Sequence, residues 1–501
     1  MSNQSIIIIG AGIAGLSAGC YGRMNGYHTQ IFEMHDKPGG LCTSWKRKDY
    51  TFDGCIHWLV GSKPGSSFNR IWQELGATQG RRMVDHEEFI RIEGEGGRAF
   101  ILYTDVDRLE QHMKELAPAD AGVIEEFCNG VRRFVRFGEA IDEPEPSPGL
   151  LASIKAGIKM LPFIGPLRKY GKIPIQDFAA RFSDPFLRHA LEAVFDVPDF
   201  PVLLLMMTLS WMHNRDAGYP IGGSLAFARA IERRYLDLGG EIHYRSRVEK
   251  ILVENDRAVG VRLAGGTEHR ADVVISAADG RATIFDMLEG KYVSQKIRRY
   301  YDELTIFQPI VQVSLGVARD LSDEPPYVSF PLTEPITVAG DVHHRIGMKH
   351  YCYDPTLAPE GKSVVVVSFP SNHAYWAELH QERERYDAEK QQIALAVIEG
   401  LEGRISGIKG QVETVDVATP VTTERYTGNW QGSMEGWMPT TQTAGMMVRG
   451  MEKTLPGLEN FHMVGQWVEF GGGLPPAAQS GRNVIRTICK QDRRAFKTQI
   501  P

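Results

Sequence analysis

The stretch that decides the fold is IIIIGAGIAG at residues 6–15, a run of isoleucine followed by a GxGxxG turn. The isoleucines predict a buried strand, and the small residues after the turn predict a helix. Gly10 allows the tight bend, Gly12 lets the backbone approach a pyrophosphate, and Gly15 lets the helix pack close to the sheet. Glu33 ends a second apolar segment, at about the 20-residue distance where an acidic group binds a ribose. The stretch therefore predicts a Rossmann-type dinucleotide site, with phosphates at the N-terminus of the helix.

A second glycine-rich segment lies near the other end of the chain. It reads GGGLPPAAQSGR at residues 471–482 and follows GQW at residues 465–467. A third segment, KPGG at residues 37–40, comes shortly after Glu33. Three successive glycines let the backbone approach a flat ring, and the two prolines suit the start of a helix. A simple NAD domain needs neither of these additional segments.

The combination of these segments resembles the FAD-binding flavoproteins of the amine oxidase and phytoene desaturase superfamily. The resemblance implies that the Gly-Gly pair and the C-terminal glycine-rich turn enclose the flavin of FAD. A helix that begins at the flavin would stabilise the negative charge of its reduced form.

Three further segments are similar to the branch of phytoene desaturases, carotenoid isomerases and retinol saturases. They are DGCIHW at residues 53–58, YPIGGS at residues 219–224, and ATPVTTERYT at residues 418–427 followed by Gly432 and Ser433. The similarity covers most of the chain and is loose in the middle third. Leu41 stands where many amine oxidases have an arginine after the Gly-Gly pair, which counts against an amine oxidase.

The motifs and the resemblance together predict the residues that bind FAD. Val248, in a strand near the adenine end, would contact the base through its backbone. The predicted cofactor-binding residues are Gly10, Gly12, Ile13, Ala14, Gly15, Glu33, Met34, Gly39, Gly40, Leu41, His57, Val248, Ala277, Gly465, Gln466, Gly473, Leu474 and Ala477.

The order of the predicted elements indicates an α/β fold with a discontinuous FAD domain. A helix is predicted at residues 225–238, and strands at residues 241–244, 247–254, 258–263 and 271–276. These elements would complete a glutathione-reductase-like domain, with a parallel sheet and a small antiparallel sheet. We assign residues 1–75, 220–290 and 450–501 to this domain.

The remaining segments form a predicted α+β substrate domain, residues 76–219 and 291–449. Helices are predicted at residues 107–116, 121–138 and 382–400, and strands at residues 310–317, 363–369 and 411–417. The substrate domain is therefore expected to be discontinuous as well.

Composition and charge exclude several classes of function. The net charge of −6 gives no basic field for nucleic acid. The six cysteines are scattered without a C-x-x-C pair, so the sequence indicates reduced thiols rather than a zinc knuckle. We expect no metal, because His343 and His344 would point to opposite faces of a strand. The first strand begins too early for a signal peptide, and no apolar run reaches the roughly 18 residues of a membrane span.

Two regions bear on the substrate and on localisation. Residues 150–172 interleave basic and apolar residues without an acidic one, which is typical of a membrane-interface helix. The alternative is a solvated helix packed on the domain and broken by Pro162 and Pro166. Residues 202–212, VLLLMMTLSWM, predict a core helix, or alternatively the lining of an apolar tunnel. We expect a cytoplasmic protein, with the first region as a candidate contact to the inner face of a membrane.

Candidate catalytic residues follow from their positions beside the cofactor motifs. Glu469 precedes the triple glycine, and a carboxyl group in an apolar flavin pocket can donate or accept a proton. His57 and Trp58 belong to a segment that the resemblance places near the flavin. His213, Arg215 and Tyr219 precede the second FAD segment, and a structural role is favoured for them. We predict Glu469 first and His57 second.

The sequence therefore predicts an FAD-dependent oxidoreductase that acts on C–C or C=C bonds of a long apolar isoprenoid, carotenoid or related lipid. Desaturation, saturation and isomerisation remain open. The alternatives are a flavin amine oxidase and a non-catalytic flavin-containing lipid-binding protein. Only one GxGxxG motif is present, so the electron acceptor is expected to be a quinone, oxygen or a protein carrier. The oligomeric state is left open.

Overall fold

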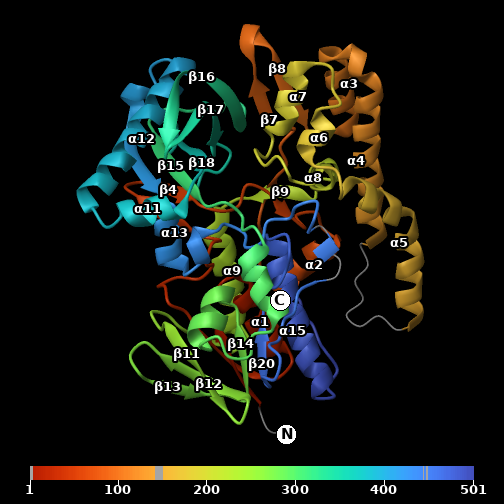
Figure 1. Cartoon of the computed structure of the whole chain (residues 1–501), viewed down its shortest axis with the longest axis vertical. Helices are drawn as coiled ribbons and strands as arrows, with labels where there is room; N and C mark the ends of the chain where they lie inside the picture. The colour runs from red at the N-terminus through yellow and green to blue at the C-terminus, as the bar shows by residue number, and fades with distance from the viewer. Residues whose placement is uncertain (1–3, 142–149, 444, 447–449) are drawn as a thin grey trace.

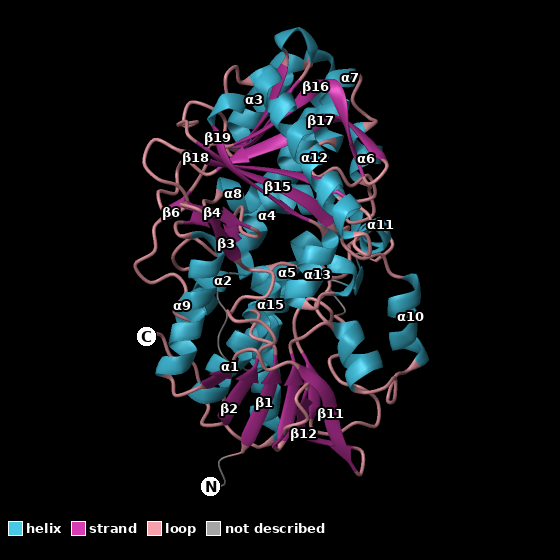
Figure 2. Ribbon diagram, turned by 90° about the vertical axis from the view of Figure 1, so that its left-hand side faces the viewer, coloured by secondary structure: helices cyan, strands magenta, loops and turns pink. Residues whose placement is uncertain are grey.

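Two large β-sheets organise the chain, one at each end of the molecule (Figure 1). The computed structural model describes residues 4–141, 150–443, 445–446 and 450–501, with side chains described outside residues 138–141 and 150–159. Figure 2 shows the first sheet at the end that carries the N-terminus and the larger sheet at the opposite end. The chain crosses between the two ends several times.

The first sheet is parallel and has five strands. Its strand order is β10 (Glu241–His243), β2 (His28–Phe32), β1 (Ser5–Ile9), β14 (Val273–Ser276) and β20 (Phe461–Met463). The isoleucines of β1 are buried as the sequence predicts, because central strands of parallel sheets are covered on both faces. The predicted strand at residues 241–244 joins the edge of this sheet. β20 is a strand that the sequence did not reveal.

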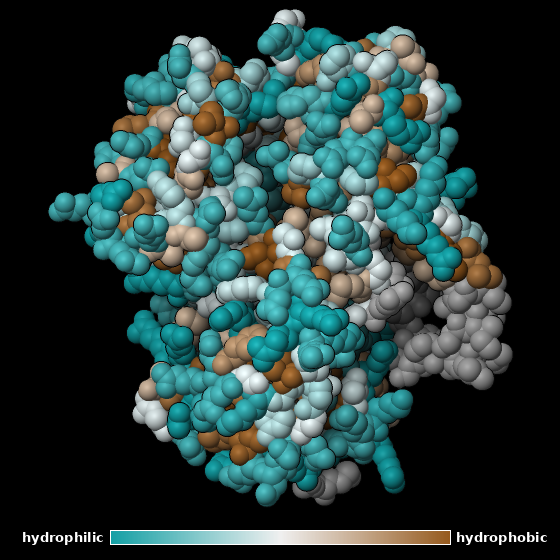
Figure 3. All heavy atoms as spheres, in the orientation of Figure 1, coloured by the Kyte–Doolittle hydropathy of each residue, from teal (hydrophilic) through white to brown (hydrophobic). Residues whose placement is uncertain are grey.

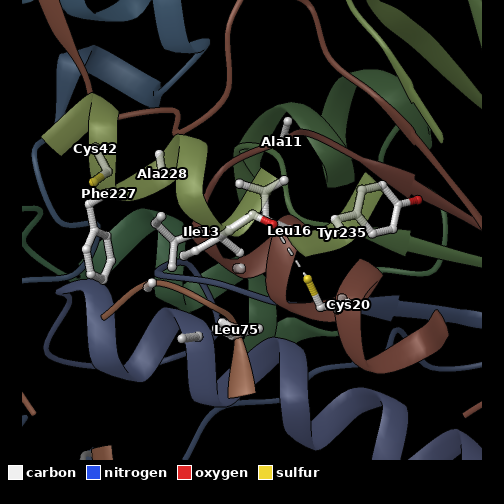
Figure 4. Close-up of a cluster of buried hydrophobic side chains, with 14 of the residues drawn as sticks. Ala11, Ile13, Leu16, Cys20, Cys42, Leu75, Phe227, Ala228 and Tyr235 are labelled. Atoms are coloured by element: carbon white, nitrogen blue, oxygen red, sulfur yellow. Dashed lines mark hydrogen bonds between the residues drawn. The ribbon is translucent and has the colours of Figure 1, made fainter. Parts of the chain in front are cut away.

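Three helices pack around the glycine turn of this sheet: α1 (Ile13–Met24), α9 (Gly223–Asp237) and α15 (Leu474–Gln491). Figure 4 shows the buried side chains between them, among which Ile13 and Leu16 of α1 lie close to Phe227 and Ala228 of α9. Cys20 donates a hydrogen bond to the carbonyl of Ile231, drawn as a dashed line in Figure 4. Segments from both ends and the middle of the chain thus share one core.

A small antiparallel sheet follows α9, as the sequence predicts. It consists of β11 (Val248–Glu254), β12 (Arg257–Leu263) and β13 (Glu268–Arg270). With the parallel sheet it forms the predicted Rossmann-type arrangement.

The second large sheet is mixed and has seven strands. Its order is β19 (Val412–Ala418), β15 (Ile310–Val317), β18 (Ser363–Pro370), β17 (Asp341–His350), β16 (Tyr327–Val338), β7 (Glu88–Glu93) and β8 (Ala99–Tyr103). β7 runs parallel to β16, and the other pairs are antiparallel. The helix α12 (Arg383–Arg404) packs against this sheet. The long hairpin of β16 and β17 was not predicted, because exposed residues interrupt its apolar pattern.

A group of helices lies beside β7 and β8 (Figure 1). It contains α3 (Val106–Leu116), α4 (Ala121–Ile141), α5 (Leu150–Tyr170), α6 (Ile175–Ala179), α7 (Pro185–Glu192) and α8 (Val202–His213). The helix α5 continues through Pro162 and Pro166, so the predicted break at these prolines is wrong. The two prolines are four residues apart, and their missing N–H groups therefore fall on the same side of the helix.

The remaining strands and helices are short and connect the two large sheets and the group of helices. They are β3 (Ser44–Arg47), β4 (Tyr50–Asp53), β5 (Leu59–Val60), α2 (Ser67–Glu74), β6 (Met83–Val84), β9 (Ala217–Pro220), α10 (Gln295–Glu303), α11 (His373–Leu379) and α13 (Pro420–Thr427). Among the helices described, none combines the length and the apolarity required to cross a bilayer.

Candidate flavin and substrate site

The predicted phosphate-binding turn connects β1 to α1. Gly10 has a φ of 95°, which only glycine adopts without strain, and its N–H donates to the carbonyl of Phe32 at 2.8 Å. A side chain on Gly15 would collide with the carbonyl oxygen of Gly10 and approach Ala277. No described atom lies within 4 Å of the position that a Cβ on Gly12 would take. Gly10 and Gly15 are thus required by the backbone turn and by close packing, whereas the space beside Gly12 is open.

The open space faces the N-terminus of α1. Gly12 is the N-cap, without a side-chain cap, and the first helical hydrogen bond runs from Leu16 to its carbonyl. The N–H groups of Ile13, Ala14 and Gly15 therefore have no acceptor within the helix. Their direction and the helix dipole favour an anionic group, as a pyrophosphate requires.

Glu33 lies at the end of β2, next to this turn. Its carboxylate accepts hydrogen bonds from the N–H groups of Ala11 at 2.7 Å and His35 at 2.8 Å. The N–H of Ser246 donates to the carbonyl of Glu33, which brings the start of β11, with Val248, alongside. The ribose acid and the predicted adenine contact therefore share one edge of the site.

The Gly-Gly segment lies directly across the turn. Gly39 pairs with Gly12 in a β-bridge and donates to the carbonyl of Ala11 at 2.9 Å. A Cβ on Gly40 would lie 3.5 Å from the Cα of Gly12. Leu41 follows in the same turn and is partly buried.

The C-terminal glycine-rich segment closes the site from the other side. A Cβ on Gly465 would lie 3.3 Å from the Cβ of Ala14, at the start of α1. Gly473 is the N-cap of α15 and has a φ of 89°. Pro475 and Pro476 carry no N–H, so Leu474 supplies the first donor of this helix, and Ala477 already bonds to the carbonyl of Gly473.

The two helices that bracket the site touch each other near their starts. The hydroxyl of Ser17 donates to the carbonyl of Ala478 at 2.6 Å, and a side chain on Gly481 would collide with the carbonyl oxygen of Ala14. Both N-termini are therefore held at one place, although their sequences lie at opposite ends of the chain.

These residues fit FAD. Open space lies over Gly12, two helix N-termini lack side-chain caps, and the buried carboxylate of Glu33 stands where the motif predicts the ribose contact. Of the other predicted contacts, the sulfur of Met34 approaches Gly428, and Gln466 donates to Asn429 at 2.9 Å. The described residues contain no group of three His, Cys, Asp or Glu side chains arranged to hold a metal ion.

Glu469 lies next to the triple glycine, but the structure gives it a partner that the sequence did not predict. Its carboxylate forms an ion pair with Lys453, with both side chains partly exposed. The sequence places this carboxyl group in an apolar pocket, whereas the structure pairs it with a lysine.

A second carboxylate, missed by the sequence reasoning, lies at the same turn. A Cβ on Gly472 would be 2.9 Å from Oε2 of Glu435. No hydrogen bond or ion pair joins Glu435 to another described residue. Because burial is not offset by a partner, it raises the pKa of Glu435 to about 7. Its position between Gly432-Ser433 and Gly436 was the only signal in the sequence.

The second part of the site is a cavity at the edge of the seven-stranded sheet. It has about 610 Å³ of space, including the part open to solvent, and its wall is mainly apolar. The wall comes from β7, α8, β9, β16, β17 and the segments that follow β4, β6, β8 and β17. Figure 3 shows this face of the molecule hollowed between the part with β16 and β17 and the part with α7 and α8.

His57 connects the cofactor segment to this cavity. The carboxylate of Asp53 accepts hydrogen bonds from Ser224, at the start of α9, and Ile56 donates to the Ser224 hydroxyl at 2.8 Å. This fixes the loop, so that His57 lines the cavity and its Nδ1 lies 3.0 Å from the hydroxyl of Tyr351. Burial, and to a lesser degree Lys349, lowers the pKa of His57 well below its usual value. His57 is therefore neutral at pH 7.

The helix α8 serves the core and reaches the cavity only at its end. Its side chains from Val202 to Leu209 are mostly buried in the cluster with α4, and Met212 lines the cavity beside Trp58. The core role predicted for residues 202–212 is thus the main one.

Comparisons with known proteins identify the family of the chain. The family model for "Flavin containing amine oxidoreductase" matches residues 13–489. Prolycopene isomerase of Daucus carota is 25% identical, over 95% of this chain and 78% of that protein. Phytoene desaturase (neurosporene-forming) of Rhodobacter capsulatus is 25% identical, over 96% of this chain and 93% of its own.

The fold agrees with solved structures as well. An oxidoreductase from Methanosarcina mazei has a TM-score of 0.58 at 18% identity, with 96% of this chain and 100% of that chain covered. The cofactor is FAD, and the protein is an FAD-dependent oxidoreductase. The chain belongs to the flavin containing amine oxidoreductase family.

Proposed function

We propose that this FAD-dependent oxidoreductase acts on carbon–carbon bonds of a long apolar isoprenoid, by desaturation, saturation or isomerisation. The observation that carries the proposal is similarity along nearly the whole chain to proteins named prolycopene isomerase and phytoene desaturase. The mainly apolar cavity beside the flavin segments supports it. We further propose a quinone or oxygen as electron acceptor.

We also propose the division into domains given by the motifs. Residues 1–75, 220–290 and 450–501 form the FAD-binding domain, and residues 76–219 and 291–449 form the substrate domain. The strands of the parallel sheet all come from the first set, and those of the seven-stranded sheet from the second, which supports this division.

The test of the function is flavin reduction under anaerobic conditions. FAD-loaded protein is mixed with phytoene, with prolycopene or with simple amines, and the absorbance near 450 nm and the products are followed. We expect the isoprenoids to react and the amines to leave the flavin oxidised. Flavin reduction by an amine, with peroxide released once oxygen is admitted, would support the amine oxidase alternative. A flavin that dithionite reduces but no isoprenoid affects would support a lipid-binding protein.

The protein must handle a proton when a C–H bond next to the reacting carbon is formed or broken. FAD supplies the hydride acceptor or donor. Glu435 lies at the triple glycine without a partner among the described residues, and its pKa of about 7 suits exchange of a proton near neutral pH. We propose Glu435 as the first candidate for this step, followed by Glu469 and His57.

Replacing Glu435 by glutamine is expected to lower turnover by about 100-fold, since general acid–base catalysis contributes about 10²–10⁴-fold. FAD should remain bound, and the ionisation near pH 7 should disappear from the pH–rate profile. Steady-state kinetics and the flavin content of the purified variant provide the measurement. Full turnover with an unchanged profile would exclude Glu435.

The matched variant is Glu469→Gln at the same turn. A strong loss of turnover with FAD retained would favour Glu469, as the sequence alone predicts. Because Lys453 holds this carboxylate in an ion pair, loss of stability without a change in the pH profile would indicate a structural role.

We propose that α5 contacts a membrane surface from which the substrate is taken. Leu161 and Ile164 are 61% and 39% exposed, and hydrophobic atoms gather on the described part of this helix in Figure 3. Arg168 is exposed beside them. Lys169 instead binds Glu126 of α4 at 2.8 Å. The side chains of Lys155 and Lys159 lie outside those described.

The double variant Leu161→Asp/Ile164→Asp should lose most of its binding to vesicles that contain anionic lipid, because charged groups cannot enter the acyl region. Leu395→Asp, on α12 and 53% exposed in the wild type, is the control and should sediment like the wild type. Liposome co-sedimentation gives the result. Equal sedimentation of the wild type and the two variants would refute the proposal. So would wild-type sedimentation of a variant in which Lys155, Lys159, Arg168 and Lys169 are reversed in charge.

A further inference from the structure

The cavity contains one cation that the function proposed above does not use. Lys349 is near the end of β17 and lines the cavity together with His57 and Tyr351. Its ammonium nitrogen lies 4.6 Å from the centre of the Tyr327 ring. No ion pair or hydrogen bond joins this nitrogen to another residue in the described part of the chain.

The acidic groups on the cavity wall do not neutralise Lys349. Glu88 is bound by Arg91 at 2.8 Å. Asp85 is exposed to solvent, and the positive charge of Arg215 acts on its carboxylate. Burial without a counter-charge lowers the pKa of Lys349 to about 7. The Lys349 ammonium is therefore a cation on the cavity wall that no described carboxylate pairs.

Further hydrogen-bonding groups surround the same space. Burial lowers the pKa of His86 to about 4, so its ring is neutral at pH 7. Nε2 of His86 is buried and has no partner among the described residues. The hydroxyl of Tyr351 and the ring of His57 form a neutral pair beside Lys349. A pure hydrocarbon leaves Nε2 of His86 and the Lys349 ammonium without a partner.

We infer that this cavity binds an elongated apolar molecule that ends in a carboxylate, with the Lys349 ammonium as its counter-charge. The inference rests on the proposed function for the apolar part of the ligand and adds the charged end. A charge-assisted hydrogen bond between carboxylate and ammonium is among the strongest that a protein forms. A neutral hydrocarbon in the same place would instead remove the last water from an unpaired charge, which is costly.

The probe is cis-parinaric acid, a fluorescent polyene carboxylate, compared with its methyl ester. Both are titrated into FAD-loaded wild type, Lys349→Met, Lys349→Arg and the control Lys362→Met, whose lysine binds Glu413 on the surface. We expect the wild type to bind the acid at least about 10-fold more tightly than the ester, equivalent to about 1.4 kcal/mol. Lys349→Met should lose this preference but keep its affinity for the ester. Lys349→Arg and Lys362→Met should keep the preference for the acid.

Equal affinity of the wild type for acid and ester would overturn the inference. So would an unchanged preference in Lys349→Met, or an equal loss in Lys362→Met. The same preparations are tested for flavin reduction by phytoene and prolycopene. Turnover of these hydrocarbons without a preference for the acid refutes the inferred carboxylate site and leaves the proposed function standing. A preference for the acid without turnover of any isoprenoid supports this site and refutes the proposed function.

Discussion

Replacement of Gly12 by alanine is expected to weaken FAD binding strongly without unfolding the protein. No described atom lies within 4 Å of the new methyl group, so the protein without FAD should keep its stability. The methyl group would occupy the space where the pyrophosphate approaches the backbone. Because overpacking costs about 1–3 kcal/mol, FAD affinity should fall by roughly 10- to 100-fold. Calorimetric titration of FAD into the apo-protein measures this change.

Two other glycines provide the controls. Gly122→Ala, at the start of α4, also places a methyl group where no described atom is within 4 Å, and it should leave FAD binding and stability unchanged. Gly15→Ala should lower the melting temperature of the apo-protein as well, because its methyl group collides with Gly10. Wild-type affinity for FAD in Gly12→Ala would contradict the position of the pyrophosphate.

Of the substitutions proposed for this protein, removal of the Arg482 guanidinium should lower the free energy of unfolding most. Arg482 of α15 is 5% exposed and binds Glu74 of α2, itself 1% exposed, at 3.3 Å. The hydroxyl of Tyr21 in α1 donates to the same carboxylate at 2.6 Å. Arg482→Met leaves that carboxylate buried without this counter-charge, which costs about 3–5 kcal/mol. We expect a markedly lower denaturation midpoint in guanidinium chloride.

The same carboxylate supplies a matched control. Arg70 also binds Glu74, at 3.2 Å, but is 41% exposed, so Arg70→Met should cost only about 0–1 kcal/mol. Adding Glu74→Gln to Arg482→Met should restore part of the lost stability, since the unpaired charge is removed. Equal effects of Arg482→Met and Arg70→Met would show that the buried ion pair does not hold α1, α2 and α15 together.

Much of the FAD-binding half could be predicted from the sequence because its signals are local. Its main motif lies within one short stretch of the chain, which contains the isoleucines of β1, the turn at Gly10 and Gly12, and the acidic residue Glu33. The strand and the turn follow from the local backbone conformation that these residues favour. The strand at residues 310–317 was likewise predicted with its observed bounds, because its apolar residues recur at every second position, the period of a strand. The β16–β17 hairpin has exposed residues and a bulge, so no regular period revealed it.

By itself the sequence determined the cofactor and the class of fold, since each follows from short motifs that are recognisable without any tertiary contact. Only the tertiary structure decided the charges around the site. Folding gives Glu469 the partner Lys453. It places Glu435 against Gly472 and Lys349 in the cavity, each without a partner among the residues that the structure describes. The state of an ionisable group depends on burial and on neighbours from distant segments, and these exist only after the chain has folded.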